Sequence, residues 1–208
     1  MGDLLRRHCV GARLTLTLCR PEVHNALNDT LIDALRVAFE EASEDAALRC
    51  VVVEGEGRSF CAGADLTWMK ALVDASPEEN RADARRLVRL LDAMVACKRP
   101  VIARVHGAAL GGGMGLVAAC DLVVAHPKAR FGLTEVRLGL APAMIFPYLL
   151  RKVQRQHLLA AALTGERFDA EQAWRLGVVN EVSEDLDAVI ARWEAALVAS
   201  GPAAVSAV

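Results

Sequence analysis

Two glycine-bearing turns offer the clearest chemistry in this sequence. They are "FCAGADL" (60–66) and "HGAALGGGMG" (106–115), and each follows a predicted strand and opens a predicted helix. Backbone N–H groups are unpaired at the start of a helix, where the helix dipole is positive. Small residues also let a ligand approach the main chain closely. The pair of turns could therefore present bare amides to a single anionic atom.

Neither turn matches a standard phosphate-binding or nucleophile motif. In the stretch 111–116 the sixth position is Leu116, where a dinucleotide fingerprint needs glycine, and no Lys-Ser or Lys-Thr pair follows to form a P-loop. The stretch "GRSFC" (57–61) ends on Cys61, where a nucleophile elbow needs glycine. Because Cys61 has no evident base, we interpret it as a packing residue. Tight helix-to-strand packing explains each glycine singly, whereas their occurrence in two such turns favours a functional role.

The elements that would position these turns are predicted from hydrophobic periodicity and capping residues. Strands are expected at 13–18, 49–57, 101–107, 121–126 and 178–182. Helices are expected at 28–43, 76–97, 114–120, 142–151, 154–163 and 169–176, and from about 186 onward. Strands alternate with helices through most of this pattern. The alternation predicts an α/β architecture with parallel strands joined by right-handed crossovers.

The composition excludes several classes of function. The 24 Lys and Arg residues against 26 Asp and Glu residues give a formal charge of −2, so no bulk positive field would attract nucleic acid or an anionic membrane. The five histidines show no metal-ligand spacing, and the six cysteines are scattered without a C-x-x-C pair. The expectation is a cytoplasmic protein with reduced thiols, no metal, no nucleic-acid partner and no membrane span.

Five segments of the chain occur in an order and spacing typical of one enzyme family. They are "RPEVHNALN" (20–28), "FCAGADL", "HGAALGGGMGLVAACDLVVA" (106–125), "ARFGLTEVRLGLAP" (129–142) and "GERFDAEQAWRLGVVNEV" (165–182). With them the sequence resembles the enoyl-CoA hydratase/isomerase (crotonase) family over almost its whole length. The resemblance implies one α/β domain over 1–208, with a crotonase-like spiral of β-β-α units to about 141 and a mainly helical part from about 142.

The resemblance also assigns roles to individual residues. It gives the backbone N–H groups of Ala64 and Gly112 the role of an oxyanion hole for a thioester carbonyl. This role agrees with the inference that the two turns present unpaired amides to an anionic atom. Glu135, in the pair Thr134-Glu135, matches the second of two catalytic glutamates in the family. Substrate and coenzyme A contacts, mostly through the backbone, are implied at Val23, Ala26, Ala62, Asp65, Leu66, Leu110, Gly111 and Thr134. Coenzyme A enters as part of the acyl-CoA substrate, with no permanently bound cofactor.

Gly115 stands where family hydratases usually carry their first glutamate. Two carboxylates normally hold and polarise the attacking water, whereas one glutamate can still move one proton. Gly115 either makes room for a branched or carboxylated acyl group or marks a one-base reaction such as double-bond isomerisation. The segments "GGGMGLVAACD" and "LTEVRLGLAPAMIFPYLLRKV" resemble bacterial methylglutaconyl-CoA hydratases of leucine breakdown, which similarly lack the first glutamate.

Three functions follow from these comparisons of motifs. The first is hydration, or the reverse dehydration, of a short and branched 2-enoyl-CoA by a homotrimer or a dimer of trimers. The second is a Δ3,Δ2-enoyl-CoA isomerase that uses one glutamate. The third is a non-catalytic homologue that binds acyl-CoA or a partner, because the chain stops at "GPAAVSAV" (201–208), earlier than typical family members.

Overall fold

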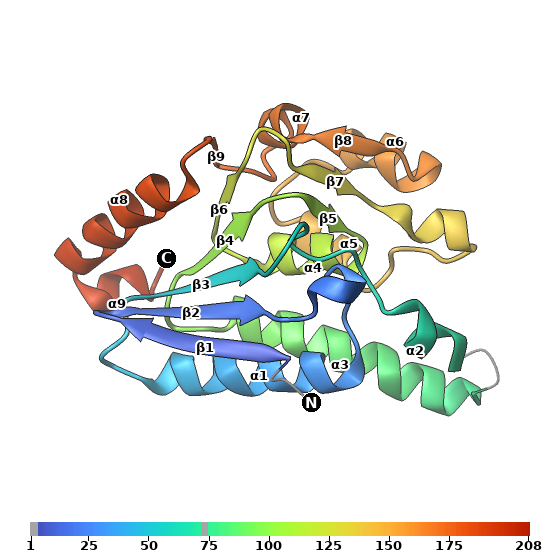
Figure 1. Cartoon of the computed structure of the whole chain (residues 1–208), viewed down its shortest axis with the longest axis horizontal. Coiled ribbons are helices and arrows are strands. Elements are labelled where there is room, and N and C mark those ends of the chain that lie inside the picture. Colours follow the sequence, from blue (N-terminus) through green and yellow to red (C-terminus); the bar gives the residue numbers. More distant parts are fainter. Residues whose placement is uncertain (1–3, 72–74) are drawn as a thin grey trace.

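The computed structural model describes residues 4–71 and 75–208, and Figure 1 shows how their elements are arranged. The strands are β1 (Leu5–Val10), β2 (Arg13–Leu18), β3 (Cys50–Gly55), β4 (Val101–Val105), β5 (Ala108–Leu110), β6 (Leu122–Ala125), β7 (Arg130–Gly132), β8 (Arg167–Asp169) and β9 (Glu181–Val182). The α-helices are α1 (Asp29–Glu44), α2 (Leu66–Ala71), α3 (Pro77–Val95), α4 (Gly112–Ala119), α5 (Phe146–Leu149), α6 (Arg155–Thr164), α7 (Ala170–Arg175), α8 (Leu186–Ala199) and α9 (Pro202–Val205), and the 3₁₀ helices are η1 (Pro21–Val23) and η2 (Thr134–Leu138). The α/β class predicted from the sequence is confirmed.

A large sheet with the strand order β1-β2-β3-β4-β6-β9 forms the frame of the molecule. From β2 to β9 the neighbouring strands are parallel, as predicted. The sequence analysis missed β1, which pairs antiparallel with β2. A turn at Gly11-Ala12 joins the two strands, and so short a connection permits only an antiparallel pair. The prediction of purely parallel strands is therefore wrong at this edge.

A second, smaller sheet with the order β5-β7-β8 lies beside the first glycine turn. Strand β5 is parallel to β7, and β7 is antiparallel to β8. Cys61 forms a bridge with Ala109 of β5, which brings the two glycine turns together. The sequence analysis missed these three-residue strands because they are too short to show a period of two.

Helices cover both faces of the large sheet. On one face α1 and α3 run side by side (Figure 1), with their apolar residues in the main core. Asn28 caps α1 by accepting a hydrogen bond from the Leu31 N–H at 2.9 Å, and Ser76 with Glu79 forms a capping box on α3. The opposite face packs against α8 in a second, smaller cluster. The predicted starts of α1 and α3 are confirmed.

The chain after residue 141 is less helical than predicted. Helices α6, α7 and α8 lie where the sequence placed them, but the stretch 142–151 contains only the four-residue helix α5. Pro147 has no N–H to donate to the residue four positions earlier, so a longer helix through this stretch would lose a hydrogen bond. The expected single domain over 1–208, with its two parts meeting near 141, stays a prediction.

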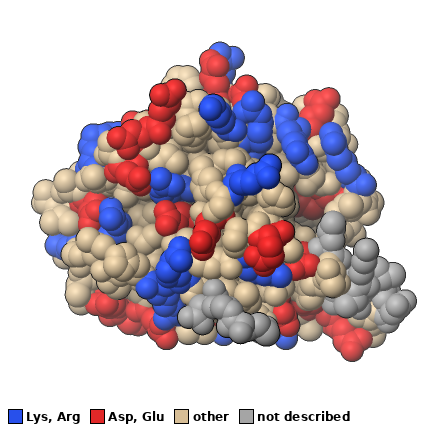
Figure 2. Space-filling view, in the orientation of Figure 1, with Lys and Arg blue, Asp and Glu red and all other residues tan. Residues whose placement is uncertain are grey.

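The distribution of charged side chains on the surface agrees with the nearly equal numbers of acidic and basic residues in the sequence. Figure 2 shows acidic and basic side chains interspersed over the visible face of the molecule. Within 4–71 and 75–208, no helix is both long and apolar enough to cross a bilayer.

Candidate active site

The turn before α2 fixes the direction of the Ala64 N–H. The carbonyl of Gly63 accepts a hydrogen bond from the Leu27 N–H at 2.7 Å, and the Asp65 N–H donates to the Leu27 carbonyl at 2.8 Å. Because a peptide unit is planar and trans, the Ala64 N–H points away from Leu27. No acceptor in the described part of the chain receives this N–H. The turn therefore presents one bare amide.

The start of α4 presents a second bare amide at Gly112. The Gly111 carbonyl accepts from the Gly115 N–H at 3.2 Å, so the Gly112 N–H in the same peptide unit points out of the helix N-terminus. Gly111 is anchored in turn, because its own N–H donates to the Gly132 carbonyl at 2.9 Å. Its φ of +49° lies in the left-handed region that glycine adopts most readily.

The two turns touch at Gly63 and Gly112. A methyl group added to Gly63 would lie 3.2 Å from the Leu110 carbonyl oxygen and 3.7 Å from the Gly112 nitrogen. One added to Gly112 would lie 3.1 Å from Leu27 Cδ1. Only residues without a side chain allow this close approach. The structure thus brings the two turns into contact, whereas their joint use as an oxyanion hole stays a prediction.

Glu135 places its carboxyl group beside the second turn. It lies in the first turn of η2, and a methyl group on Gly111 would be 3.5 Å from Glu135 Oε1. The other oxygen, Oε2, is buried and has no hydrogen-bond partner among the described residues. Burial disfavours the charged form and raises the pKa of Glu135 above its ordinary value. The arrangement combines a poised proton acceptor with two amides that can stabilise a negative oxygen.

The space next to Gly115 is filled by apolar side chains. A methyl group at this position would lie 2.6 Å from Ile145 Cγ2 and 3.4 Å from Leu91 Cδ1. Both side chains are buried, with exposed fractions of 2% for Ile145 and 0% for Leu91. Packing against Ile145 and Leu91 therefore accounts for a glycine at this position, and the expectation that Gly115 opens room for a larger acyl group stays a prediction. The Ile145 side chain occupies the space into which a side chain at position 115 would project.

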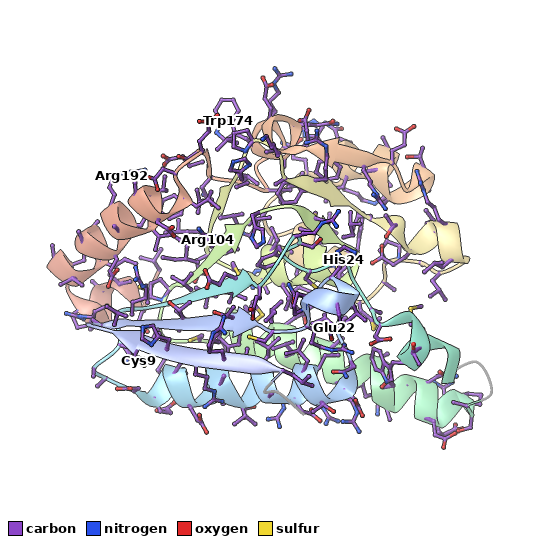
Figure 3. The ribbon with its side chains drawn as sticks, in the orientation of Figure 1. Cys9, Glu22, His24, Arg104, Trp174 and Arg192 are labelled. Atoms are coloured by element: carbon purple, nitrogen blue, oxygen red, sulfur yellow. The ribbon has the colours of Figure 1, made fainter. Side chains whose placement is uncertain are left out.

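The predicted coenzyme positions lie along the first turn and the segment before α1. Val23, at the end of η1 near the labelled Glu22 and His24 in Figure 3, is exposed, whereas Ala26 is buried. Ala62 is half-buried and donates its N–H to the His24 carbonyl at 3.0 Å. These backbone positions are brought into one neighbourhood, and their contact with coenzyme A stays a prediction.

The remaining predicted contacts differ in their surroundings. Leu110 is buried at the end of β5, and Thr134 is half-buried at the start of η2. The side chain of Leu66 lies outside the described residues. The Asp65 carboxylate forms an ion pair with Arg20 Nη2 at 2.7 Å, so its side chain makes a contact within the protein. The sequence analysis missed Arg20, although it begins the segment "RPEVHNALN".

Cys61 lies under the first turn as a packing residue. Its side chain is buried, and burial raises the pKa of its thiol to about 12. A thiol in this state is not a nucleophile near neutral pH. The Cys61 Sγ lies 3.9 Å from the Gly63 carbonyl oxygen, so the side chain packs against the first turn.

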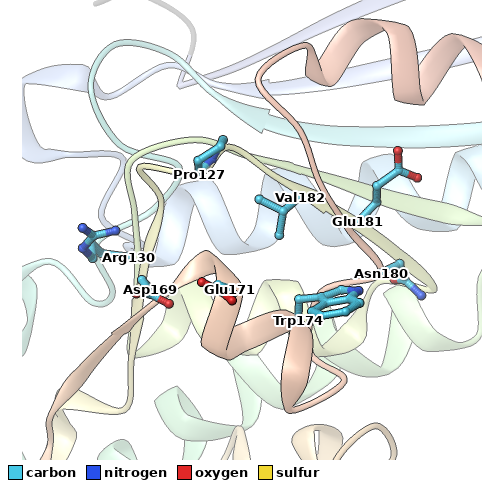
Figure 4. A pocket seen from close by; sticks show the side chains of 8 residues that line it. All are labelled: Pro127, Arg130, Asp169, Glu171, Trp174, Asn180, Glu181 and Val182. Carbon is cyan, nitrogen blue, oxygen red and sulfur yellow. The ribbon is translucent and has the colours of Figure 1, made fainter.

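A cavity of about 550 Å³ lies elsewhere, between the ends of β7, α7 and β9 (Figure 4). Its lining includes Arg130, Asp169, Trp174 and Glu181, and neither the two turns nor Glu135 contribute to it. Within the described parts of the chain, no three His, Cys, Asp or Glu side chains gather as metal ligands do.

Comparison with known proteins gives one consistent result. The profile of the family described as "Enoyl-CoA hydratase/isomerase" matches residues 12–208. A Thermus thermophilus protein named as a candidate enoyl-CoA hydratase is 36% identical over 163 residues, which cover 78% of this chain and 64% of that protein. The mitochondrial Δ(3,5)-Δ(2,4)-dienoyl-CoA isomerase of Dictyostelium discoideum is 31% identical over 184 residues, which cover 84% of this chain and 63% of the isomerase. The chain thus spans slightly less than two thirds of these two relatives.

The fold is also shared with solved structures. The crystal structure of an enoyl-CoA hydratase from Shewanella pealeana superposes with a TM-score of 0.95 at 33% sequence identity. The match covers 98% of this chain and 77% of that chain. The crotonase-like architecture expected from the motifs is confirmed.

Proposed function

Because the chain belongs to the enoyl-CoA hydratase/isomerase family, we propose that it adds water to a short 2-enoyl-CoA with Glu135 as its acid and base. The observation that carries this proposal is the Glu135 carboxyl group beside the Gly111 turn, whose buried Oε2 has no hydrogen-bond partner within 4–71 and 75–208. A carboxyl group left without a partner is costly to bury unless the site uses it. The free amides of Ala64 and Gly112 support the same reaction.

The proposed hydration balances with one glutamate. Glu135 takes a proton from a water molecule as the water oxygen bonds to the β-carbon of the enoyl thioester. The electron pair of the C=C bond moves to form an enolate, whose oxygen accepts hydrogen bonds from the amides of Ala64 and Gly112. Glu135 then returns a proton to the α-carbon, and the product has gained H and OH. Each amide aimed at the enolate oxygen is worth about 3 kcal/mol of barrier.

The environment of Glu135 suits both halves of this cycle. A group that accepts and then donates a proton works best when its pKa lies near the working pH. Burial shifts the pKa of Glu135 upward, in the direction of neutral pH. The carbonyl of Glu135 also accepts from the Leu140 N–H at 3.1 Å, which holds the η2 turn in place. The same side chain can therefore serve first as base and then as acid.

Isomerisation of a 3-enoyl-CoA is the second candidate, favoured by the packing of Ile145 against Gly115. With no carboxylate at position 115, the site has one proton carrier rather than the usual pair. In this reaction Glu135 removes a proton from the α-carbon, the dienolate oxygen binds the two amides, and Glu135 returns the proton to the γ-carbon. The 31% identity to a dienoyl-CoA isomerase is compatible with such chemistry.

Finer expectations rest on the resemblance of the motifs. They are a short branched acyl group of the kind met in leucine breakdown, a cytoplasmic location, and a homotrimer or dimer of trimers. Coenzyme A contacts along Val23, Ala26 and Ala62 belong to the same proposal. Sedimentation of the purified protein would test the oligomer.

Product analysis with three thioesters distinguishes the candidates. The protein would be incubated with 3-methylglutaconyl-CoA, crotonyl-CoA and a 3-enoyl-CoA, followed by thioester-conjugated absorbance and product mass. A mass gain of one water on an enoyl substrate supports hydration, and double-bond migration at unchanged mass supports the isomerase. No change with any of the three, while acyl-CoA still binds, supports a non-catalytic homologue. Turnover that survives in Glu135→Gln would refute the role of Glu135 in either reaction.

A further inference from the structure

Arg20 uses its guanidinium group to join two segments on either side of the first turn. It follows β2, and its Nη1 donates to the Ala26 carbonyl at 2.5 Å while Nη2 donates to Asp65 Oδ2 at 2.7 Å. The Arg20 and Asp65 side chains are each only 12% exposed. A guanidinium fork holds its partners in a fixed geometry that lysine does not reproduce. Arg20 is therefore a rigid clamp.

The clamp encloses the peptide unit that carries the Ala64 N–H. One anchor, Ala26, precedes Leu27, whose N–H binds the Gly63 carbonyl and whose carbonyl accepts from the Asp65 N–H. The other anchor is the Asp65 side chain, on the residue directly after Ala64. A closed ring of hydrogen bonds thus holds the peptide unit between Gly63 and Ala64, whose N–H has no acceptor among the described residues.

Asp65 connects Arg20 to the start of α2. Its Oδ1 accepts from the Thr67 N–H at 2.8 Å, so the same carboxylate binds Arg20 and the first turn of the helix. The hydrogen bond from Arg20 lowers the pKa of Asp65, which keeps the carboxylate ionised. A partly buried ion pair of this kind contributes little certain stability, and its clearest effect is on geometry.

We propose that Arg20 is a positioning residue that aims the Ala64 N–H at the thioester oxygen through Ala26 and Asp65. The inference rests on the proposed function, because it assigns the Ala64 amide to that oxygen. Catalytic groups need placement within about 0.5 Å of the productive geometry. Misplacement by about 1 Å can lower a rate roughly 100-fold. Loss of the clamp should therefore reduce stabilisation of the enolate more than binding of the coenzyme.

The test uses acetoacetyl-CoA, whose enolate has its own ultraviolet absorbance. An oxyanion hole favours the bound enolate, so the absorbance at fixed pH reports on the amides without any turnover. In Arg20→Met we expect the bound enolate signal to fall about 10-fold and kcat to fall about 10- to 100-fold, with KM changed less than kcat. Arg20→Lys should recover part of both losses. Arg36→Met, which removes a solvent-side ion pair with Glu40 on α1, is the matched control and should change neither.

The outcomes separate this inference from the proposed function. An unchanged enolate signal and kcat in folded Arg20→Met would overturn the inference. If Arg20→Met fails to fold, Asp65→Asn keeps an acceptor for α2, removes the charge and should still weaken the enolate signal. If the wild type forms the bound enolate but transforms no enoyl-CoA, the proposed reaction fails while the positioning role is still supported by an Arg20-dependent signal. A wild type that forms no bound enolate refutes the inference, whatever its turnover.

Discussion

Replacing Glu135 by glutamine is expected to lower turnover steeply and to stabilise the fold at the same time. Loss of a general acid or base lowers a rate by about 100- to 10,000-fold. The buried Oε2 has no hydrogen-bond partner in the described part of the chain, and a buried polar group in that state costs about 1–3 kcal/mol. Glutamine keeps the shape and removes the charge, so we expect a gain of about 1 kcal/mol in the free energy of unfolding at neutral pH.

The pH dependence of this gain follows from the direction of the pKa shift. Burial raises the pKa of Glu135 in the folded state above its ordinary 4.5. Between these two values the unfolded state binds fewer protons than the folded state, so the stability of the wild type falls as pH rises through this interval. The advantage of Glu135→Gln should be complete above the raised pKa. It should vanish below the ordinary value, where both states are protonated.

Thermal and urea denaturation at about pH 4 and about pH 8 would measure the effect. For a chain of this length, a gain of about 1 kcal/mol raises Tm by about 2–4 °C. The reasoning is refuted if the variant is less stable than the wild type at pH 8, or if the difference does not depend on pH. The first result would mean that the carboxylate has a stabilising partner in solution, and the second that folding does not shift the pKa of Glu135.

Three further predictions concern packing around the site. Gly113→Ala should lower the free energy of unfolding in urea by about 1–3 kcal/mol, because the added methyl would overlap the Cys61 carbonyl oxygen. Gly115→Glu should also be destabilising, and Ile145→Ala in the same chain should restore part of the loss, since Ile145 Cγ2 lies 2.6 Å from the added carbon. Iodoacetamide on the native protein should label exposed Cys9, whereas the Cys61 thiol, with its pKa raised to about 12, should react only after denaturation.

Each of these predictions has a control and a contrary result. Gly201→Ala adds a methyl group that has no atom of the described residues within 4 Å, and it should change stability by less than about 0.5 kcal/mol. Equal effects at Gly113 and Gly201 would contradict the argument from close approach. Additive losses in the Gly115→Glu and Ile145→Ala pair would mean that the two positions do not compete for space. Labelling of Cys61 at the rate of Cys9 would show that the first turn opens in solution.

Local signals in the sequence determined the helices that frame the site. Asn28 before α1 and the Ser76-Pro77-Glu78-Glu79 run before α3 predicted where those helices begin, because side-chain caps act within a few residues. Hydrophobic periodicity likewise predicted that both segments are helical, and each helix buries its apolar residues in the core. Short strands such as β5, β7 and β8 escaped the prediction, since a three-residue strand is stabilised by its neighbours rather than by its own pattern.

The sequence by itself also determined the kinds of residue at the site: two glycine-bearing turns that open helices, and one glutamate after "FGLT". Only the tertiary structure decided their relation. It placed Gly63 against Gly112, the Glu135 carboxyl beside Gly111, and Ile145 in the space next to Gly115. These contacts join segments far apart along the chain, and no local propensity encodes them. They arise because parallel crossovers bring the ends of separate strands to one edge, where packing sets which groups meet.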